Sequence, residues 1–203
     1  MIYKNNIDES EYYINDLKDI ELDLIKVKKS NPLYVKWFIE HYPESKGIVG
    51  RQLNFLIYSF GKPIGIIGFA SPPLNYNIFN KYFDFDINNK SGENAKKILN
   101  NNVFRIVYTQ KNYGTKILKI ARNKVYKLYY EQYNDKLLGL VTFVEPPRTG
   151  AIYKADNWIY LGNTKGIEVK RRGDNWTEKQ YFKGIQKLIF GYKYNIKECN
   201  IPL

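Results

Sequence analysis

The chain has 203 residues and a mass of 24.0 kDa, and 44% of its residues are hydrophobic. This is enough for one sizeable core and short for two. The single cysteine, Cys199, excludes an internal disulfide, and with the single histidine, His41, it cannot build a His/Cys zinc site. No apolar segment approaches a membrane span, and the N-terminus lacks a signal-peptide pattern. We therefore expect one domain over residues 1–203, no membrane partner and a cytoplasmic location.

The net charge of +12 is unevenly distributed. Residues 1–50 hold 7 lysines and 9 acidic residues, so the rest of the chain holds 25 of the 32 basic and 11 of the 20 acidic residues. Such a positive field attracts polyanions: nucleic acid first, an anionic membrane or a CoA-like cofactor second. Aromatic residues, at 16%, add stacking candidates for unpaired bases. A Lys-, Asn-, Ile- and Tyr-rich composition inherited from an A+T-rich genome explains part of both features.

Two helices are expected at the N-terminal end, over residues 1–45. Apolar residues at helical spacing between Ser10 and Lys29 predict the first, which ends before Pro32. Residues 33–42 predict the second, which ends at Pro43. His41 closes it and titrates near neutrality, so it is a candidate catalytic base, although a lone histidine is more often a satisfied surface or core residue.

The next segments predict strands. Residues 53–58 and 64–71 are β-rich runs joined by a turn with Gly and Pro, which is typical of a hairpin. Residues 74–102 have few periodic apolar positions and predict a long insertion or lid loop. Residues 103–108 predict another strand, in which Arg105 is the only charge. A charge in that setting needs a partner or a ligand, so Arg105 is a candidate site residue.

A glycine-bearing turn then leads into a predicted helix over residues 116–130. Strand, turn and helix in this order leave free N–H groups that suit phosphate. The candidate cofactor-binding residues are Asn112, Tyr113, Gly114 and Thr115. One face of the helix carries Lys116, Lys119, Arg122, Lys124 and Lys127, which is either a phosphate track or a solvated face.

The stretch from Val141 to Gly162 combines the strongest chemical signals. Residues 137–144 predict a buried strand that ends at Glu145 before two prolines, where a carboxylate of an α/β sheet is well placed to meet a ligand. Gly150 allows a close turn, and Tyr153 and Asn157 are expected to share a helical face. Asn157 as a hydrogen-bond donor and Trp158 as a wall or stacking surface are candidate substrate- or DNA-binding residues. The alternative is that Glu145 caps backbone and that the aromatic residues are core.

Basic residues beyond this stretch predict contacts with a nucleic-acid backbone. Lys165, Lys170, Arg171 and Arg172 occupy a predicted flexible loop, and Arg51 is a further candidate. Residues 177–194 are compatible with helix or strand in their second half.

The chain resembles the GNAT-like superfamily over roughly residues 33–190, in the branch that includes the Mom-type phage DNA-adenine modification proteins and the Druantia anti-phage domain. The resemblance rests on Gly150-x-x-Tyr153-x-x-x-Asn157-Trp158-x-x-x-Gly162, preceded by Glu145. It implies an α/β (α+β) single domain with a central mixed sheet flanked by helices, in a bacterial or phage-infected host cell.

The resemblance also implies an activity. Mom-type proteins add a carbamoylmethyl group to the exocyclic amine of adenine, which blocks restriction, and are thought to hold an iron-like metal, here at Glu145 and Tyr153. Two features depart from the family: this acid is Glu rather than Asp, and the turn Gln110-x-x-x-Gly114-Thr115 is longer than the GNAT pyrophosphate turn and has a single glycine.

Three functions remain open from the sequence. The first is a Mom-type DNA-modifying transferase in which Glu145, Tyr153, Arg105 and His41 are catalytic. The second is a Druantia-like component that binds DNA without modifying it. The third is an acyl-CoA-dependent transferase on another substrate. The expected partners are double-stranded DNA and a small-molecule donor, acyl-CoA or another, with a homodimer as one possible assembly.

Overall fold

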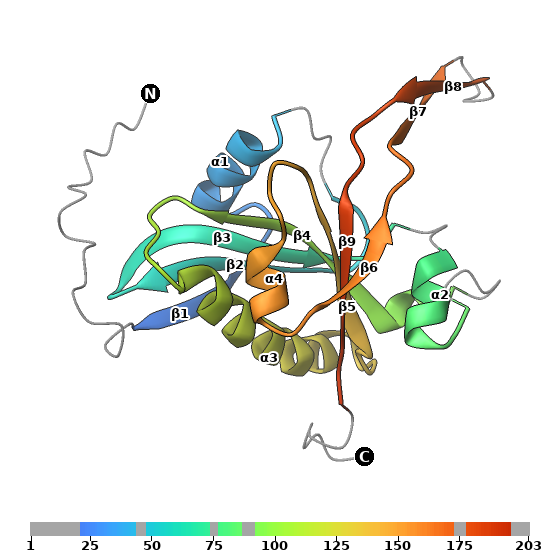
Figure 1. Ribbon diagram of the computed structural model, residues 1–203. Helices are drawn as coiled ribbons and strands as arrows, with labels where there is room; N and C mark the ends of the chain where they lie inside the picture. The colour runs from blue at the N-terminus through green and yellow to red at the C-terminus, as the bar shows by residue number, and fades with distance from the viewer. Residues whose placement is uncertain (1–20, 44–47, 74–76, 87–91, 173–177, 196–203) are drawn as a thin grey trace.

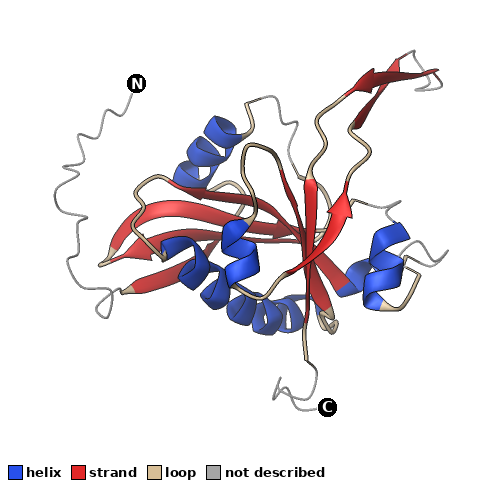
Figure 2. Ribbon diagram, in the orientation of Figure 1, coloured by secondary structure: helices blue, strands red, loops and turns tan. Residues whose placement is uncertain are grey.

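The computed structural model describes residues 21–43, 48–73, 77–86, 92–172 and 178–195, with only the backbone for 168–182. A seven-stranded sheet in the order β1-β2-β3-β4-β5-β9-β6 forms its centre (Figures 1 and 2). Its strands are β1 (Leu22–Val27), β2 (Gln52–Ser59), β3 (Lys62–Ala70), β4 (Ile98–Ile106), β5 (Gly139–Val144), β9 (Leu188–Lys193) and β6 (Ile159–Asn163). Among the described strands, the β4–β5 pair alone is parallel.

Helices cover both faces of the sheet. One face carries α3 (Tyr113–Tyr133) and the short α4 (Ala151–Ala155), which pack on apolar side chains of β2, β3, β4 and β5. The other face carries α1 (Pro32–His41) over β2, β3 and β4, and α2 (Asn77–Phe83) over β4, β5 and β9. A 3-10 turn, η3 (Ala95–Lys97), leads into β4. None of the helices in the described ranges is long and apolar enough to cross a membrane.

A second, two-stranded sheet extends from the connection between β6 and β9. It consists of β7 (Ile167–Arg172) and β8 (Glu178–Lys183), which pair antiparallel and project beyond the main sheet in Figure 1. At its base the Gly184 N–H donates to the Gly166 carbonyl at 2.8 Å, and the Thr164 N–H donates to the Lys187 carbonyl at 2.9 Å. We call this ribbon the β7–β8 arm.

The predicted second helix and hairpin are confirmed, as are the strand before Glu145 and the long basic helix. The first predicted helix is wrong in its described part, because residues 22–27 form β1. This strand pairs with β2 over six residues, from Leu22 opposite Ser59 to Val27 opposite Asn54. Residues 10–20 of that prediction lie outside the described part. Sheet pairing here overrides a helical periodicity that residues 22–27 satisfy equally well.

The lid loop predicted over residues 74–102 is also wrong where the structure describes it. Residues 77–83 form α2, which buries Phe79 and Phe83, one turn apart, against β5 and β9. Residues 98–102 already belong to β4, although three of them are asparagines. Residues 74–76 and 87–91 lie outside the described part. In the undecided stretch after residue 177, the structure has the strands β8 and β9.

Candidate functional site

The parallel strands β4 and β5 separate part-way along their length. Their pairing runs from Ile98 opposite Gly139 to Asn101 opposite Thr142 and ends there. Beyond this point β4 pairs with β3 and β5 pairs with β9. The two strands therefore form a fork, which we call the β4–β5 fork, and their facing backbone edges beyond it carry polar groups that can pair with an extended ligand.

A β-bulge lies at the base of the fork. In the pairing of β3 with β4, Gly68 is opposite Val103 and Phe69 is opposite Asn101, so Asn102 has no partner in β3 and none in β5. The Tyr42 hydroxyl donates to the Asn102 carbonyl at 2.8 Å. Bulges occur next to active sites, where they re-aim backbone and side chains.

Several buried polar atoms around the bulge have no hydrogen-bond partner within the described residues. They are both polar atoms of the Asn102 amide, Oδ1 of Asn100 and Nε of Arg105. A buried polar atom without a partner costs about 1–3 kcal/mol, so such atoms are rare in folded proteins unless they meet water or a ligand. Their concentration on one strand segment makes the fork the best candidate for a binding site.

The face of the fork toward α4 holds a closed hydrogen-bond network. The hydroxyl of Tyr153, on α4, donates to Oδ1 of Asn101 at 2.7 Å. The Asn101 amide donates to the carbonyls of Gly68 at 2.9 Å and Val103 at 3.1 Å. The Thr142 hydroxyl donates to the Asn101 carbonyl at 3.1 Å. Burial raises the pKa of Tyr153, so its phenol stays protonated and remains a proton donor.

The opposite side of the fork carries charged groups from several elements. Nη2 of Arg105 lies 2.8 Å from Oε2 of Glu40, on α1. Nζ of Lys187, which precedes β9, lies 2.8 Å from Oε2 of Glu145, which follows β5. Burial lowers the pKa of His41, at the end of α1, and the positive charges of Arg148 and Arg105 lower it further. His41 is therefore held in its neutral form at pH 7, the state that a proton acceptor needs.

The start of α3 follows β4 directly. Asn112 precedes the helix with φ 68°, and its side chain makes no capping hydrogen bond. Gly114 packs closely on α4, since a Cβ at this position would lie 2.9 Å from Cγ2 of Ile152. Tyr113, predicted to bind a cofactor, is instead buried and its hydroxyl lies 3.1 Å from the Ser59 hydroxyl. Asn112, Gly114 and Thr115 thus remain as candidates at this turn.

Gly150 permits the tight entry into α4 that the sequence predicts. Its φ is 72°, and a Cβ would lie 2.3 Å from the Phe190 ring. The predicted shared face of Tyr153 and Asn157 is wrong, because α4 ends at Ala155 and Asn157 has φ 62° in an exposed turn. Trp158 is no pocket wall: it is buried and its Nε1 donates to Oδ2 of Asp156 at 3.1 Å.

The predicted pairing of Glu145 with Tyr153 as one unit does not match the geometry. Glu145 is bound to Lys187, whereas the Tyr153 hydroxyl is bound to Asn101 inside the core. A metal at Tyr153 would require a phenolate, which burial opposes. In the described ranges there is no group of three His, Cys, Asp or Glu side chains that could hold a metal. The residues present do not fit the metal site that the Mom-type resemblance implies.

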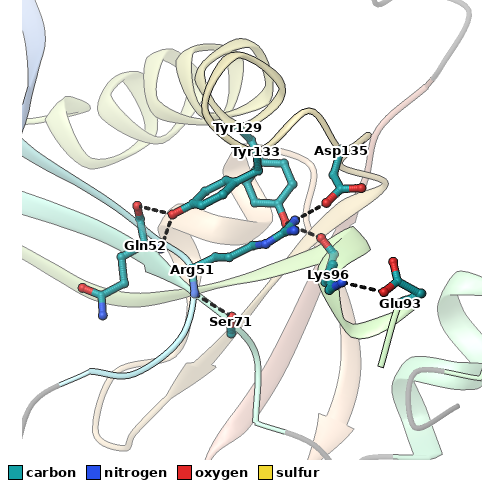
Figure 3. A network of polar contacts seen from close by, with 8 residues as sticks. All are labelled: Arg51, Gln52, Ser71, Glu93, Lys96, Tyr129, Tyr133 and Asp135. Carbon is teal, nitrogen blue, oxygen red and sulfur yellow. Dashed lines mark hydrogen bonds and ion pairs between the residues drawn. The ribbon is translucent and has the colours of Figure 1, made fainter. Parts of the chain in front are cut away.

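Arg51, predicted to bind DNA, belongs to an internal network at the other end of the sheet (Figure 3). Its Nη1 donates to the Tyr129 hydroxyl at 2.7 Å and pairs with Asp135, and its guanidinium lies 4.8 Å from the centre of the Tyr133 ring. The Tyr129 hydroxyl in turn donates to the Lys96 carbonyl. This network ties the start of β2 to the end of α3, so Arg51 has a structural role.

Arg51→Met should lower the free energy of unfolding by about 2 kcal/mol, because it leaves the buried Tyr129 hydroxyl without its charged donor and Asp135 without its counter-ion. DNA affinity should change less than twofold. Urea denaturation and filter binding at low salt measure the two quantities. A variant of wild-type stability that binds DNA weakly would instead assign Arg51 to the DNA interface.

Two of the five cations on the basic face predicted on α3 are engaged within the protein. Arg122 pairs with Asp156 at 3.0 Å, and Lys124 pairs with Asp23 at 2.6 Å. Both are therefore unavailable as members of a phosphate track. Of the predicted basic loop, Lys165 is exposed and Lys170, Arg171 and Arg172 belong to β7 of the arm.

Five residues of the fork were missed from the sequence: Tyr42, Asn101, Asn102, Arg148 and Lys187. Hydropathy and spacing gave no signal for the asparagines, which follow an apolar pair and suggest a loop. Arg148 had one available signal, because it lies three residues after Glu145 in the same strand-end loop. His41 and Arg105, selected from the sequence, do lie on the same side of the fork.

Comparisons with solved structures agree with this topology. An acetyltransferase of Bacillus subtilis, solved in complex with CoA, matches with a TM-score of 0.52 and 7% identity, covering 86% of this chain and all of that one. A GNAT family acetyltransferase from Elizabethkingia anophelis with acetyl-CoA bound has a TM-score of 0.48 and 10% identity, covering 85% of this chain and 98% of that one. The first likeness shows that the fold is the predicted mixed α/β fold of the GNAT type.

No curated protein matches the chain. One family does match, over residues 2–174, which is most of the chain and includes β1 to β7, the whole β4–β5 fork and Tyr153. Its description is Druantia protein DruA. The chain belongs to the Druantia protein DruA family.

Proposed function

We propose that the chain is a group-transfer enzyme that binds a small activated donor in the β4–β5 fork and modifies an amine of DNA. The observation that carries this proposal is the open edge of β4 at Asn102, a residue with no strand partner in β3 or β5 and with buried side-chain amide atoms that form no hydrogen bond within the described residues. An extended donor of the acyl-thioester class can add to that edge by main-chain hydrogen bonds, as a peptide adds to a sheet edge.

The donor side of the fork offers contacts for both ends of such a molecule. The amide oxygens of Asn102 and Asn100 can accept hydrogen bonds next to the open edge, and the first turn of α3 supplies N–H groups at Gly114 and Thr115 for phosphate. Neither feature depends on the glycine-rich turn that this chain lacks. A thioester donor, when bound, would supply an activated carbonyl carbon, so that the amine N–C bond forms as the C–S bond breaks and a thiol leaves.

The chain's own groups can carry the protons of this exchange. His41, neutral at pH 7, is the candidate acceptor of the amine proton. Tyr153, whose pKa burial raises, is the candidate donor of a proton to the leaving group. His41 ends α1 and Tyr153 lies on α4, and these helices cover opposite faces of the sheet. This arrangement suits an acceptor that enters from the α1 side and a donor that lies along β4.

We propose DNA as the acceptor because of charge and shape. The positive net charge lies outside residues 1–50, and the β7–β8 arm projects from the connection between β6 and β9, the strand that pairs with β5 of the fork. The arm is a two-stranded ribbon, a shape that the major groove admits. Within DNA we put forward the exocyclic amine of adenine and a carbamoylmethyl-like group, as the Mom-type resemblance implies.

A second candidate is DNA binding without chemistry. The sequence of the arm favours it, because Lys170, Arg171 and Arg172 follow one another along β7. Such a run of positive charge attracts the phosphates of DNA whether or not the bound DNA is modified.

Nucleoside mass spectrometry of DNA from cells that express the chain distinguishes these functions. We expect an adenine adduct that disappears with Tyr153→Phe. The second candidate would be selected by unchanged DNA together with duplex binding at low salt. Changing Lys170, Arg171 and Arg172 to Glu should abolish that binding. Unchanged DNA, no duplex binding and CoA-dependent acylation of another substrate would overturn both.

A further inference from the structure

Three cationic side chains gather on the α1 side of the β4–β5 fork, around Tyr42, whose hydroxyl donates a hydrogen bond to the Asn102 carbonyl. Arg105 comes from β4, Arg148 from the loop after β5 and Lys187 from the residue before β9. Lys187 and Arg148 both act on the pKa of Tyr42, and Arg148 and Arg105 both act on that of His41. Segments far apart in the sequence therefore bring positive charge to one place.

The cations of this cluster are not equally neutralised. Glu40 pairs with Arg105 and Glu145 pairs with Lys187, both at 2.8 Å. Arg148 is exposed and forms no ion pair with any residue that the structure describes. One full positive charge therefore remains next to His41.

The cluster also has hydrogen-bond donors to spare. Nε of Arg105 and the Nδ2 amide of Asn102 are buried and have no acceptor among the described residues. A phosphate group has several oxygens and accepts hydrogen bonds from more than one donor at once. The guanidinium of Arg148, Nε of Arg105 and the amide of Asn102 are donors of the kind that it binds.

We propose that Arg148 and Arg105 form a phosphate-binding site for the acceptor, which holds the nucleotide phosphate next to the amine that is modified. This inference rests on the proposed function and adds the chemistry that selects the acceptor. A carboxylate of a protein acceptor fits less well, because Glu40 and Glu145 already supply carboxylates to two of the cations.

His41 offers a direct readout, because it is the single histidine of the chain. Its Cε1–H signal can be followed by NMR in the full-length protein as pH is varied. The facing groups that set its charge state are Arg148 and Arg105, with Tyr42 in edge contact at 4.4 Å between ring centres. An anion bound at the two arginines would offset their charge and raise the pKa of His41.

The experiment compares deoxyadenosine monophosphate, deoxyadenosine, inorganic phosphate and coenzyme A as probes. We expect the monophosphate to raise the pKa of His41 with saturation and deoxyadenosine to leave it unchanged. Inorganic phosphate should act more weakly than the monophosphate. Coenzyme A should bind, as a thermal shift shows, without the same effect on His41.

Arg148→Gln should raise the pKa of His41 before any ligand is added, and should weaken the binding of the monophosphate by about tenfold. Lys154→Gln is the matched control, because Lys154 is an exposed cation on α4 outside the cluster; it should change neither quantity. If deoxyadenosine acts as well as its monophosphate, or coenzyme A alone moves the signal, or Arg148→Gln changes nothing, the site is wrong. If the phosphate site is wrong but coenzyme A still binds, the proposed donor site is still supported. If coenzyme A does not bind at all, that result counts against the proposed function and not against the phosphate site.

Discussion

Replacing Tyr153 by phenylalanine is expected to slow group transfer by about a hundredfold or more while the chain still folds. The substitution removes the hydroxyl that lies 2.7 Å from Asn101 at the base of the fork. Burial raises the pKa of this phenol, so it is protonated throughout the physiological range and its O–H can stabilise the negative charge that develops on a leaving group. The rate of adduct formation, measured on purified protein and DNA, tests this.

Tyr34→Phe is the matched control. Tyr34 is buried too, burial also raises its pKa, and its hydroxyl donates to Oδ1 of another asparagine, Asn54, at 3.0 Å. Both substitutions should lower the free energy of unfolding by about 1–2 kcal/mol, since each leaves an amide oxygen without its donor. Only the change at Tyr153 should slow transfer. Equal rates in the two variants would give Tyr153 a purely structural role.

The fork also changes what is expected of Glu145. The sequence suggested that Glu145 and Tyr153 act as a unit, yet one is paired with Lys187 and the other with Asn101. Glu145 is also the more exposed of the two, with 40% of its side-chain surface accessible. Glu145 is thus better placed to hold Lys187 beside the acceptor than to take part in the same proton transfer.

Much of the fold could be predicted from local patterns, because elements such as α3 and β5 have a clear periodicity that does not depend on contacts with distant segments. The stripe of Ile117, Leu118, Ala121 and Val125 indicates α3, and those residues are buried. The run that ends at Glu145 indicates β5. Each of these segments has one clear periodicity and clear signals at its ends. The secondary structure that the local sequence favours is therefore the one that packs in the folded protein.

The fork could not be predicted in the same way, because it depends on where a pairing stops. Asn100, Asn101 and Asn102 suggest a loop by composition, and only the parallel register with β5 and the bulge opposite β3 make them part of a strand. Likewise, the sequence shows that Arg105 needs a partner, but it does not show whether that partner is Glu40 or a ligand. The structure shows Glu40 on one nitrogen and leaves Nε without a partner among the described residues.

The electrostatic role of Arg148 was hidden for a related reason. Its neighbours in the sequence are prolines, a threonine and a glycine, which indicate a turn and no chemistry. Its position becomes meaningful because α1 brings His41 and Tyr42 to the same place from more than a hundred residues away in the sequence. Long-range convergence of this kind leaves no trace in the spacing of nearby residues.

Asp156→Asn is expected to cause the largest loss of stability, about 3 kcal/mol. Asp156 is 3% exposed and ends α4. Its carboxylate accepts from Nε of Arg122 at 3.0 Å and from Nε1 of Trp158 at 3.1 Å. Burial raises the pKa of Asp156 even though Arg122 acts in the opposite direction, so the attraction only partly offsets the cost of burying the charge. Removing that charge nevertheless leaves Arg122, itself mostly buried, without its counter-ion.

Asp23→Asn provides the control for this prediction, because it removes an ion pair of the same type with Lys124 at an exposed position. It should cost about 0.5 kcal/mol or less. Guanidinium denaturation of both variants measures the difference, and similar losses would contradict a structural role for the buried pair. Because the Asp156 carboxylate also holds Trp158, whose ring packs edge-on against Tyr153 with 5.1 Å between the ring centres, its substitution should displace Tyr153 as well. We therefore expect Asp156→Asn to reduce transfer at temperatures where the protein is still folded, although Asp156 touches neither side of the fork.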